Sequence, residues 1–72
     1  MNKNKYDWAT VERRIKWIAK DCDGLIYGFT HEPTMNPYGF GLNEGFAKRL
    51  NWLSTEIKWQ QSLEKRPEDQ SQ

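Results

Sequence analysis

The side chains with catalytic or metal-binding chemistry are few in this chain and stand in no recognisable arrangement. The chain holds one histidine, His31, and one cysteine, Cys22. His31 is followed by Glu32, but no serine or cysteine is spaced to form a nucleophile–base pair with it. Cys22 lies between Asp21 and Asp23, whose negative charges disfavour the thiolate that a nucleophile or a metal ligand requires. We therefore expect no enzymatic activity, no bound metal and no cofactor.

Length and composition point to one small domain that relies on aromatic side chains. The chain has 72 residues, with four Trp, three Tyr and three Phe, and aromatic rings bury the most surface per position. A lone cysteine allows no intrachain disulfide. Eleven basic and ten acidic residues give a net charge of +1, so no overall field attracts nucleic acid or anionic lipid. We expect one domain over residues 6–66, with flexible ends at 1–5 and 67–72.

The strongest local pattern is a β-hairpin over residues 15–20 and 25–30. Two β-prone runs, IKWIAK and LIYGFT, flank the turn DCDG, and Asp-Gly between such runs is typical of a hairpin. Strict alternation predicts a buried face made of Ile15, Trp17, Ala19, Leu25, Tyr27 and Phe29. The same alternation places Ile18 and Ile26 on the outer face.

The remaining segments are less regular. Residues 31–45 contain two prolines and three glycines, a composition typical of a loop. Residues 46–58 fit both a helix, through an apolar stripe, and a third strand, through alternation. Short helical segments are expected at both ends of the domain, so the predicted fold class is α+β around a small antiparallel sheet. We expect these ends to be held on the sheet by structural anchors, namely Trp8, Trp17, Trp59 and Leu63.

Short phrases in the chain resemble those of small phage and prophage proteins. They are Asp7-Trp8 near the start, Trp17-Ile18-Ala19 followed by Asp23-Gly24 and an aromatic strand, and Trp59-Gln60-Gln61-Ser62-Leu63-Glu64-Lys65-Arg66-Pro67 near the end. The last phrase has the form W-x-x-S-L-x-x-R-P. The resemblance implies a compact sheet of three or so antiparallel strands with short terminal helical turns, and a third strand at 49–54. It also implies a phage-encoded protein. The single cysteine fits a reducing cytoplasm, which would then be that of the host, and no run of 18 or more apolar residues predicts a membrane segment.

The function that we expect is non-enzymatic protein binding. Aromatic residues and methionine are enriched where proteins meet, and several lie in or beside the segment 31–45. The candidate contact residues are Met35, Tyr38, Phe40, Phe46, Ile18 and Ile26. The expected partner is a host protein or a defence-system protein, which the chain would bind and modulate as an inhibitor. A second copy could also pair with an open sheet edge to form a homodimer.

The alternative is a small nucleic-acid or nucleotide-binding module. Its candidate contacts are basic residues with neighbouring aromatic rings, namely Arg13, Arg14, Lys16, Lys48 and Arg49. Salt separates the two hypotheses, because binding to phosphates weakens steeply as the salt concentration rises.

Overall fold

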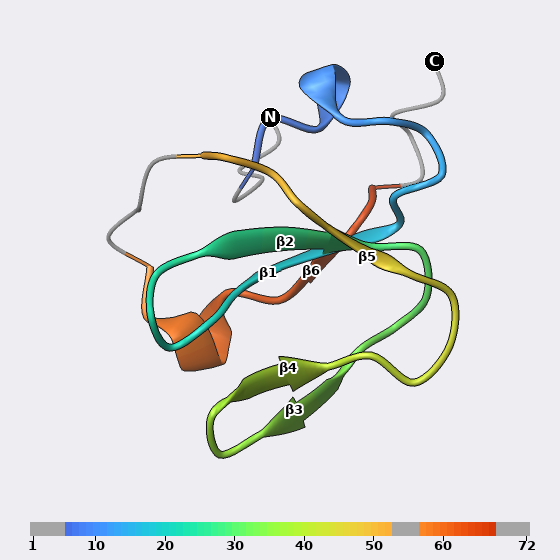
Figure 1. Ribbon diagram of the computed structural model, residues 1–72. Helices are drawn as coiled ribbons and strands as arrows, with labels where there is room; N and C mark the ends of the chain where they lie inside the picture. Colours follow the sequence, from blue (N-terminus) through green and yellow to red (C-terminus); the bar gives the residue numbers. More distant parts are fainter. Residues whose placement is uncertain (1–5, 53–56, 68–72) are drawn as a thin grey trace.

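The protein is a layered arrangement of short antiparallel strands, shown in Figure 1. The computed structural model describes residues 6–52 and 57–67. Within them, the strands are β1 (Trp17–Lys20), β2 (Ile26–Phe29), β3 (Thr34–Asn36), β4 (Gly39–Gly41), β5 (Ala47–Arg49) and β6 (Glu64–Lys65). Two 3-10 turns, η1 (Trp8–Thr10) and η2 (Trp59–Gln61), complete the set. The predicted flexible ends, apart from Pro67, lie outside the described residues.

The predicted hairpin is confirmed, with strands that are shorter than expected. β1 and β2 pair antiparallel, with Trp17 opposite Phe29 and Lys20 opposite Ile26. In the turn, the amide of Gly24 donates to the carbonyl oxygen of Asp21 at 2.9 Å. Gly24 has a φ of 92°, a conformation that glycine adopts without steric penalty. The Asp-Gly turn therefore acts as the sequence predicts.

The hairpin is the centre of a four-stranded sheet in the order β5-β2-β1-β6. The sequence left open whether residues 46–58 form a helix or a strand. The structure has a strand there, β5, at Ala47–Arg49. This third strand begins earlier than the segment 49–54 that the resemblance implies. β6 adds a fourth strand that the sequence does not predict, with Ile18 opposite Glu64.

The prediction of a plain loop over residues 31–45 is wrong in its centre. β3 and β4 form a second, two-stranded sheet, with Met35 opposite Phe40. Its turn has Pro37 and Tyr38 at its centre and ends at Gly39, which has a φ of 149°. The side-chain oxygen of Asn36 accepts the amide of Tyr38 at 3.0 Å, as asparagine does in tight turns. The turn-forming residues thus serve a hairpin instead of an irregular loop.

The expected terminal helical segments are corrected to single 3-10 turns of three residues each. Neither Asp7 before η1 nor Lys58 before η2 makes a side-chain cap hydrogen bond. Helix nucleation is unfavourable, and segments this short lack the residues to propagate. The described part of the chain is therefore a small sheet-rich fold rather than a balanced α+β fold.

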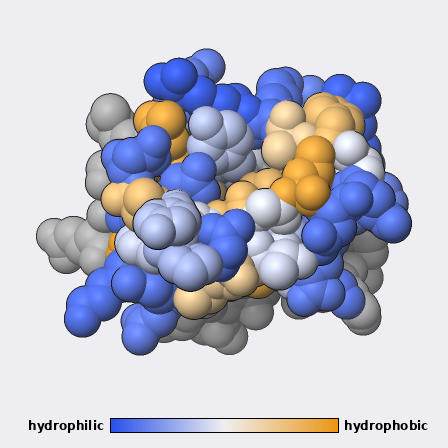
Figure 2. Space-filling model, turned by 60° about the horizontal axis from the view of Figure 1, so that its bottom comes forward, coloured by the Kyte–Doolittle hydropathy of each residue, from blue (hydrophilic) through white to orange (hydrophobic). Residues whose placement is uncertain are grey.

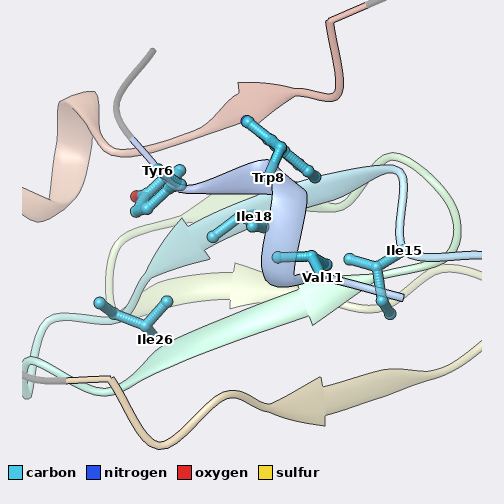
Figure 3. Close-up of a cluster of buried hydrophobic side chains, with 6 residues drawn as sticks. All are labelled: Tyr6, Trp8, Val11, Ile15, Ile18 and Ile26. Atoms are coloured by element: carbon cyan, nitrogen blue, oxygen red, sulfur yellow. The ribbon is translucent and has the colours of Figure 1, made fainter. Parts of the chain in front are cut away.

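Both faces of the four-stranded sheet are covered. On one face the N-terminal segment packs its side chains onto the hairpin, and Figure 3 shows this cluster. Its members, all at most 9% exposed, are Tyr6, Trp8, Val11, Ile15, Ile18 and Ile26. On the other face β4 and η2 lie against β1, and Ala19 and Phe29 are buried. Figure 1 shows the sheet between η1 above and the β3–β4 hairpin below.

The placement of Ile18 and Ile26 on an exposed outer face is therefore wrong. Ile18 is 0% exposed and Ile26 is 2% exposed. Alternation kept Ile18 and Ile26 together on one face, but it wrongly placed Ile15 on the opposite face, since Ile15 packs with them in the core cluster. It also could not show that the N-terminal segment covers this face. Because both faces are buried, period-2 reading alone cannot identify the solvent side.

The two described ends of the chain are fastened to each other across the sheet. The hydroxyl of Tyr6 donates to the carbonyl oxygen of Ser62 at 2.6 Å. The indole N–H of Trp8 donates to Glu64 Oε1 at 2.7 Å. Burial raises the pKa of Tyr6 to about 12, so its hydroxyl stays protonated and remains a donor at ordinary pH.

Ser62 connects this end of the chain to β1. Its side chain is 0% exposed, and its hydroxyl oxygen accepts the amide of Lys20 at 2.7 Å. The same hydroxyl donates to the carbonyl oxygen of Trp59 at 2.7 Å. A buried serine with both donor and acceptor satisfied fixes the chain between η2 and β6.

Candidate functional site

The largest exposed hydrophobic side chains of the described residues gather on and beside the β3–β4 hairpin. Tyr38 at its turn is 82% exposed, Met35 in β3 is 52% exposed, and Leu42 just after β4 is 45% exposed. Figure 2 shows this side of the molecule, where hydrophobic surface in the middle is bordered by hydrophilic side chains. An apolar area rimmed by polar groups is the usual composition of a protein-binding surface.

The hairpin is fixed to the body of the protein beneath this surface. Phe40 packs edge-on against Trp59, with ring centroids 6.1 Å apart and an interplanar angle of 89°. The amide of Phe40 donates to Asp21 Oδ1 at 3.3 Å. Gly39 is buried, and a Cβ there would lie 2.7 Å from the same carboxylate oxygen. The hairpin therefore presents its tip from a defined position.

The carboxylate of Asp21 lies against the backbone of the hairpin, so its ionisation is affected by this contact. Burial raises the pKa of Asp21, the charge of Asp23 raises it further, and the amide of Phe40 opposes both. The carboxylate is therefore less stable in the folded protein than in water.

The predicted protein-binding residues fall into three groups. Met35 and Tyr38 are exposed as a contact surface requires. Phe40 and Phe46 are half-buried, since Phe40 contacts Trp59 and Phe46 lies under the guanidinium of Arg14, 4.3 Å from its ring centroid. The buried residues Ile18 and Ile26 are removed from the candidate surface. Leu42 belongs on it although sequence reasoning did not select it.

The basic residues of the alternative hypothesis are exposed, and two of them, Arg14 and Lys48, meet at the carboxylate of Glu12. The carboxylate of Glu12 accepts from Lys48 Nζ at 2.7 Å and from Arg14 Nε at 2.8 Å. Hydrogen bonds from Lys48 and then Arg14 lower the pKa of Glu12. Glu12 therefore remains charged and offsets part of the positive charge at this place.

The other members of the basic set lie around this centre. Arg49 follows Lys48 in β5 and lines a pocket with it. Arg13 lies near Arg66, whose pKa is lowered first by burial and then by the charge of Arg13. Lys16 is exposed just before β1.

The predicted anchors differ in how deeply they are buried. Trp8 is 2% exposed, whereas Trp17, Trp59 and Leu63 are half-buried. Trp17 lies beneath the ammonium of Lys65, 5.9 Å from its ring centroid. Trp8 therefore belongs to the core cluster, and the other three lie outside it.

Sequence reasoning missed the residues of the C-terminal phrase that hold it in place. Ser62, Glu64 and Arg66 stand two apart, and each bonds to the N-terminal half of the chain. The signal that could have found them is this alternation of polar side chains, which indicates one shared face of a strand.

The side chains with catalytic chemistry stand on the surface. His31 Nδ1 lies 2.9 Å from the hydroxyl of Thr30, and His31 Nε2 lies 3.5 Å from Glu44. Cys22 is an exposed free thiol in the β1–β2 turn. Among the described residues, no three His, Cys, Asp or Glu side chains are grouped as metal ligands would be.

Comparisons with protein-family models, curated proteins and solved structures find no match for this chain. The resemblance to small phage and prophage proteins accordingly stays a prediction. Within the described residues, no helix has the length and apolar character needed to cross a membrane.

Proposed function

We propose that this protein is a non-enzymatic binding module that attaches to another protein through the β3–β4 hairpin. The observation that supports the proposal is the grouping of Met35, Tyr38 and Leu42, which are the large hydrophobic side chains that are 45% exposed or more within residues 6–52 and 57–67. All three lie within eight residues of one another, on a hairpin whose base is fixed by Phe40 and Asp21.

Tyr38 is the expected centre of the contact. Tyrosine supplies a large apolar ring and a polar hydroxyl while losing little conformational freedom, which is why it recurs at binding hot spots. The turn around Pro37 holds the backbone of Tyr38, because the amide of Tyr38 is bonded to Asn36. Met35 and Leu42 add flexible apolar contact beside the ring.

The proposed partner is a host or defence-system protein of a bacterium, and the proposed role is that of a phage accessory protein that modulates it. The basis is the resemblance of the D-W, D-G and W-x-x-S-L-x-x-R-P phrases described above. The host cytoplasm is the proposed location, since its reducing conditions suit an exposed, unpaired Cys22.

A homodimer through a sheet edge is less favourable at β5 than we expected. Lys48 and Arg49 occupy this edge, and two copies paired there would bring like charges together. A partner of different composition avoids that repulsion.

The experiment that tests the proposal is capture of partners from bacterial lysate on the tagged protein, after nuclease treatment and at low and high salt. We expect one protein to be retained at high salt by the wild type and lost with the double variant Met35→Ser/Tyr38→Ser. The matched control is Lys58→Ser/Gln60→Ser, which changes two exposed residues around η2.

Two results would contradict the proposal. Retention of the same protein by the Met35→Ser/Tyr38→Ser variant would show that the hairpin is not the contact surface. Recovery of nucleic acid alone, and only at low salt, would favour the basic residues instead.

A further inference from the structure

The edge of the four-stranded sheet at β5 is open. β5 pairs with β2 on one side, and the sheet order β5-β2-β1-β6 leaves its other side without a strand. All three residues of β5 are exposed. An open edge can accept a further strand through backbone hydrogen bonds. β5 is therefore a place where another chain can extend the sheet.

The hydrogen bonds between β2 and β5 show which backbone groups of β5 point outward. Backbone hydrogen bonds flank the strand on both sides, namely from Leu50 to Ile26 at 2.9 Å and from Thr30 to Phe46 at 3.1 Å. In an antiparallel ladder, residue pairs that exchange hydrogen bonds alternate with pairs that do not. Ala47 and Arg49 belong to the pairs that do not, so their N–H and C=O groups point away from β2.

These outward groups have no partner within the described part of the chain. Among residues 6–52 and 57–67, no hydrogen bond outside the ladder includes the backbone of Ala47 or Arg49. The N–H and C=O groups of two alternate residues thus face solvent, and alternate residues are those that an added strand pairs with.

The other edges of the described sheets offer less to an added strand. β3 lies between Pro33 and Pro37, which have no N–H to donate. The outer side of β4 is already in contact with the β1–β2 turn, where the amide of Phe40 donates to Asp21. β6 has only two residues and is closely followed by Pro67. β5 is therefore the edge best suited to a further strand.

The charges at β5 decide which kind of strand fits. Lys48 and Arg49 belong to the strand, and Arg14 lies over the ring of Phe46 just before it, 4.3 Å from the centroid. Glu12 is paired with Lys48 and Arg14, whereas Arg49 has no ion-pair partner among residues 6–52 and 57–67. Like charges oppose pairing with a second copy, and the same charges attract an acidic strand.

The free cation points to one face of the sheet. Successive side chains of a strand point to opposite faces. Lys48 lies on the face of the N-terminal segment, where Glu12 reaches it. Arg49 lies opposite the half-buried Tyr27 and shares its face. The guanidinium of Arg49 is thus placed to meet a carboxylate that an added strand carries on this face.

We propose that the β5 edge binds an extended acidic segment of a partner protein, which adds a strand to the sheet. The backbone hydrogen bonds of the segment go to Ala47 and Arg49, and an Asp or Glu of the segment pairs with the guanidinium of Arg49. This surface is separate from the β3–β4 hairpin and does not rest on the function proposed for that hairpin. Because β5 is short, we expect the affinity of a transient complex.

The probe is a synthetic heptapeptide that alternates valine with glutamate, titrated into the ¹⁵N-labelled full chain. Amide hydrogen exchange is followed by NMR at Ala47, Lys48 and Arg49. In the free chain we expect faster exchange at Ala47 and Arg49 than at Lys48, whose amide belongs to the ladder with β2. Near saturation, the peptide should slow exchange at Ala47 and Arg49 about tenfold or more and change Lys48 little.

Two variants separate the backbone contribution from the charge. Ala47→Pro removes an outward N–H without removing a bond to β2, so it should weaken peptide binding several-fold. A peptide with methylated backbone amides tests the same hydrogen bonds on the wild-type chain. Arg49→Gln keeps the backbone and should also weaken binding several-fold. Its matched control is Lys58→Gln, at an exposed position outside β5, which should bind as the wild type does.

The variant Met35→Ser/Tyr38→Ser should leave peptide binding unchanged, so that failure of the β5 site and failure of the proposed hairpin contact can be told apart. The proposal is overturned if the glutamate peptide leaves exchange at Ala47 and Arg49 unchanged at millimolar concentration. It is also overturned if a peptide with lysine in place of glutamate binds equally well, or if a single-stranded oligonucleotide binds at β5 and the peptide does not. Exchange that slows with rising concentration of the chain alone would show that a second copy covers the edge, which would equally overturn it.

Discussion

At the scale of single residues, Asp21 joins the β1–β2 turn to β4, and its ionised form is destabilised in that position. Its Oδ1 accepts the amide of Phe40 at 3.3 Å and faces the buried backbone of Gly39. Burial and the nearby charge of Asp23 raise the pKa of Asp21 above its ordinary value of 3.8. The hydrogen bond favours folding, while the ionisation of the same group opposes it.

The pH dependence of stability follows from this raised pKa. The folded state holds the proton of Asp21 more tightly than the unfolded state, so the contribution of this group is greatest below pH 3.8 and is lost as the pH rises through the folded-state pKa. Asp21→Asn keeps an oxygen acceptor for Phe40 and removes the charge. We expect the variant to be at least as stable as the wild type at neutral pH, measured by urea unfolding across the acid range.

Asp7→Asn is the control for this comparison, because it removes one negative charge from an exposed side chain. The stability difference between Asp21→Asn and the wild type should grow as the pH rises above 3.8. A difference that stays flat across the acid range would show that Asp21 is as well solvated in the folded protein as in the unfolded chain.

At the scale of elements, the β3–β4 hairpin buries few of its side chains. All three residues of β3 are exposed, and the hairpin depends on the Phe40–Trp59 ring contact and on Asp21 for its attachment. Elements with little buried surface open locally at low free-energy cost. We therefore expect the hairpin to be less stable than the β1–β2 pair.

Trp59→Ala tests this difference between the elements. The sequence alone predicts a buried anchor, whose loss would cost about 3–5 kcal/mol of global stability. The structure has Trp59 half-buried against Phe40, so we expect mainly a local loss of about 0.5–1.5 kcal/mol from the ring pair and some further loss of buried area. Amide hydrogen exchange should accelerate in β3 and β4 far more than in β1 and β2.

Gln60→Ala, in the same 3-10 turn, should leave the exchange rates unchanged because Gln60 is exposed. Equal acceleration in both hairpins after Trp59→Ala would restore the interpretation of Trp59 as an anchor of the whole fold.

The elements also show what a sequence of this kind can and cannot predict. The β1–β2 hairpin was predictable because its turn and its strands are encoded within sixteen adjacent residues, 15–30. The burial of Ile18 and Ile26 was not, because it depends on the distant N-terminal segment that covers them. The grouping of Glu12 with Lys48 likewise arises from residues 36 positions apart, which no local pattern connects.

At the scale of the whole molecule, the fold is closed by its two described ends. Residues 6–15 and 62–66 contribute the side chains and carbonyl groups that join them. A domain of this size has a small core and a small margin of stability. Contacts between distant ends therefore account for a large share of what keeps the four-stranded sheet covered.

Arg66 is the central residue of this closure. Its guanidinium donates to the carbonyl oxygens of Ile15 at 2.8 Å, Val11 at 3.2 Å and Glu12 at 2.5 Å. It also lies over the ring of Trp8, 4.9 Å from the centroid. One planar group thus satisfies three backbone acceptors that have no regular strand partner and covers a core tryptophan.

Arg66→Met should lower the free energy of unfolding by about 2–3 kcal/mol, because charge-assisted hydrogen bonds are lost and carbonyl groups near the core are left without their donor. Arg66→Lys should recover only a minor part of this lost stability, since a single ammonium cannot reach the three carbonyl oxygens that the planar guanidinium reaches with its several N–H groups. Urea unfolding followed by tryptophan fluorescence measures both, with the exposed Arg49→Met as the matched control. If Arg66→Lys proves as stable as the wild type, the positive charge alone holds the two ends together. If Arg66→Met is also as stable as the wild type, the ends are held by Tyr6, Trp8 and Ser62 and do not need Arg66.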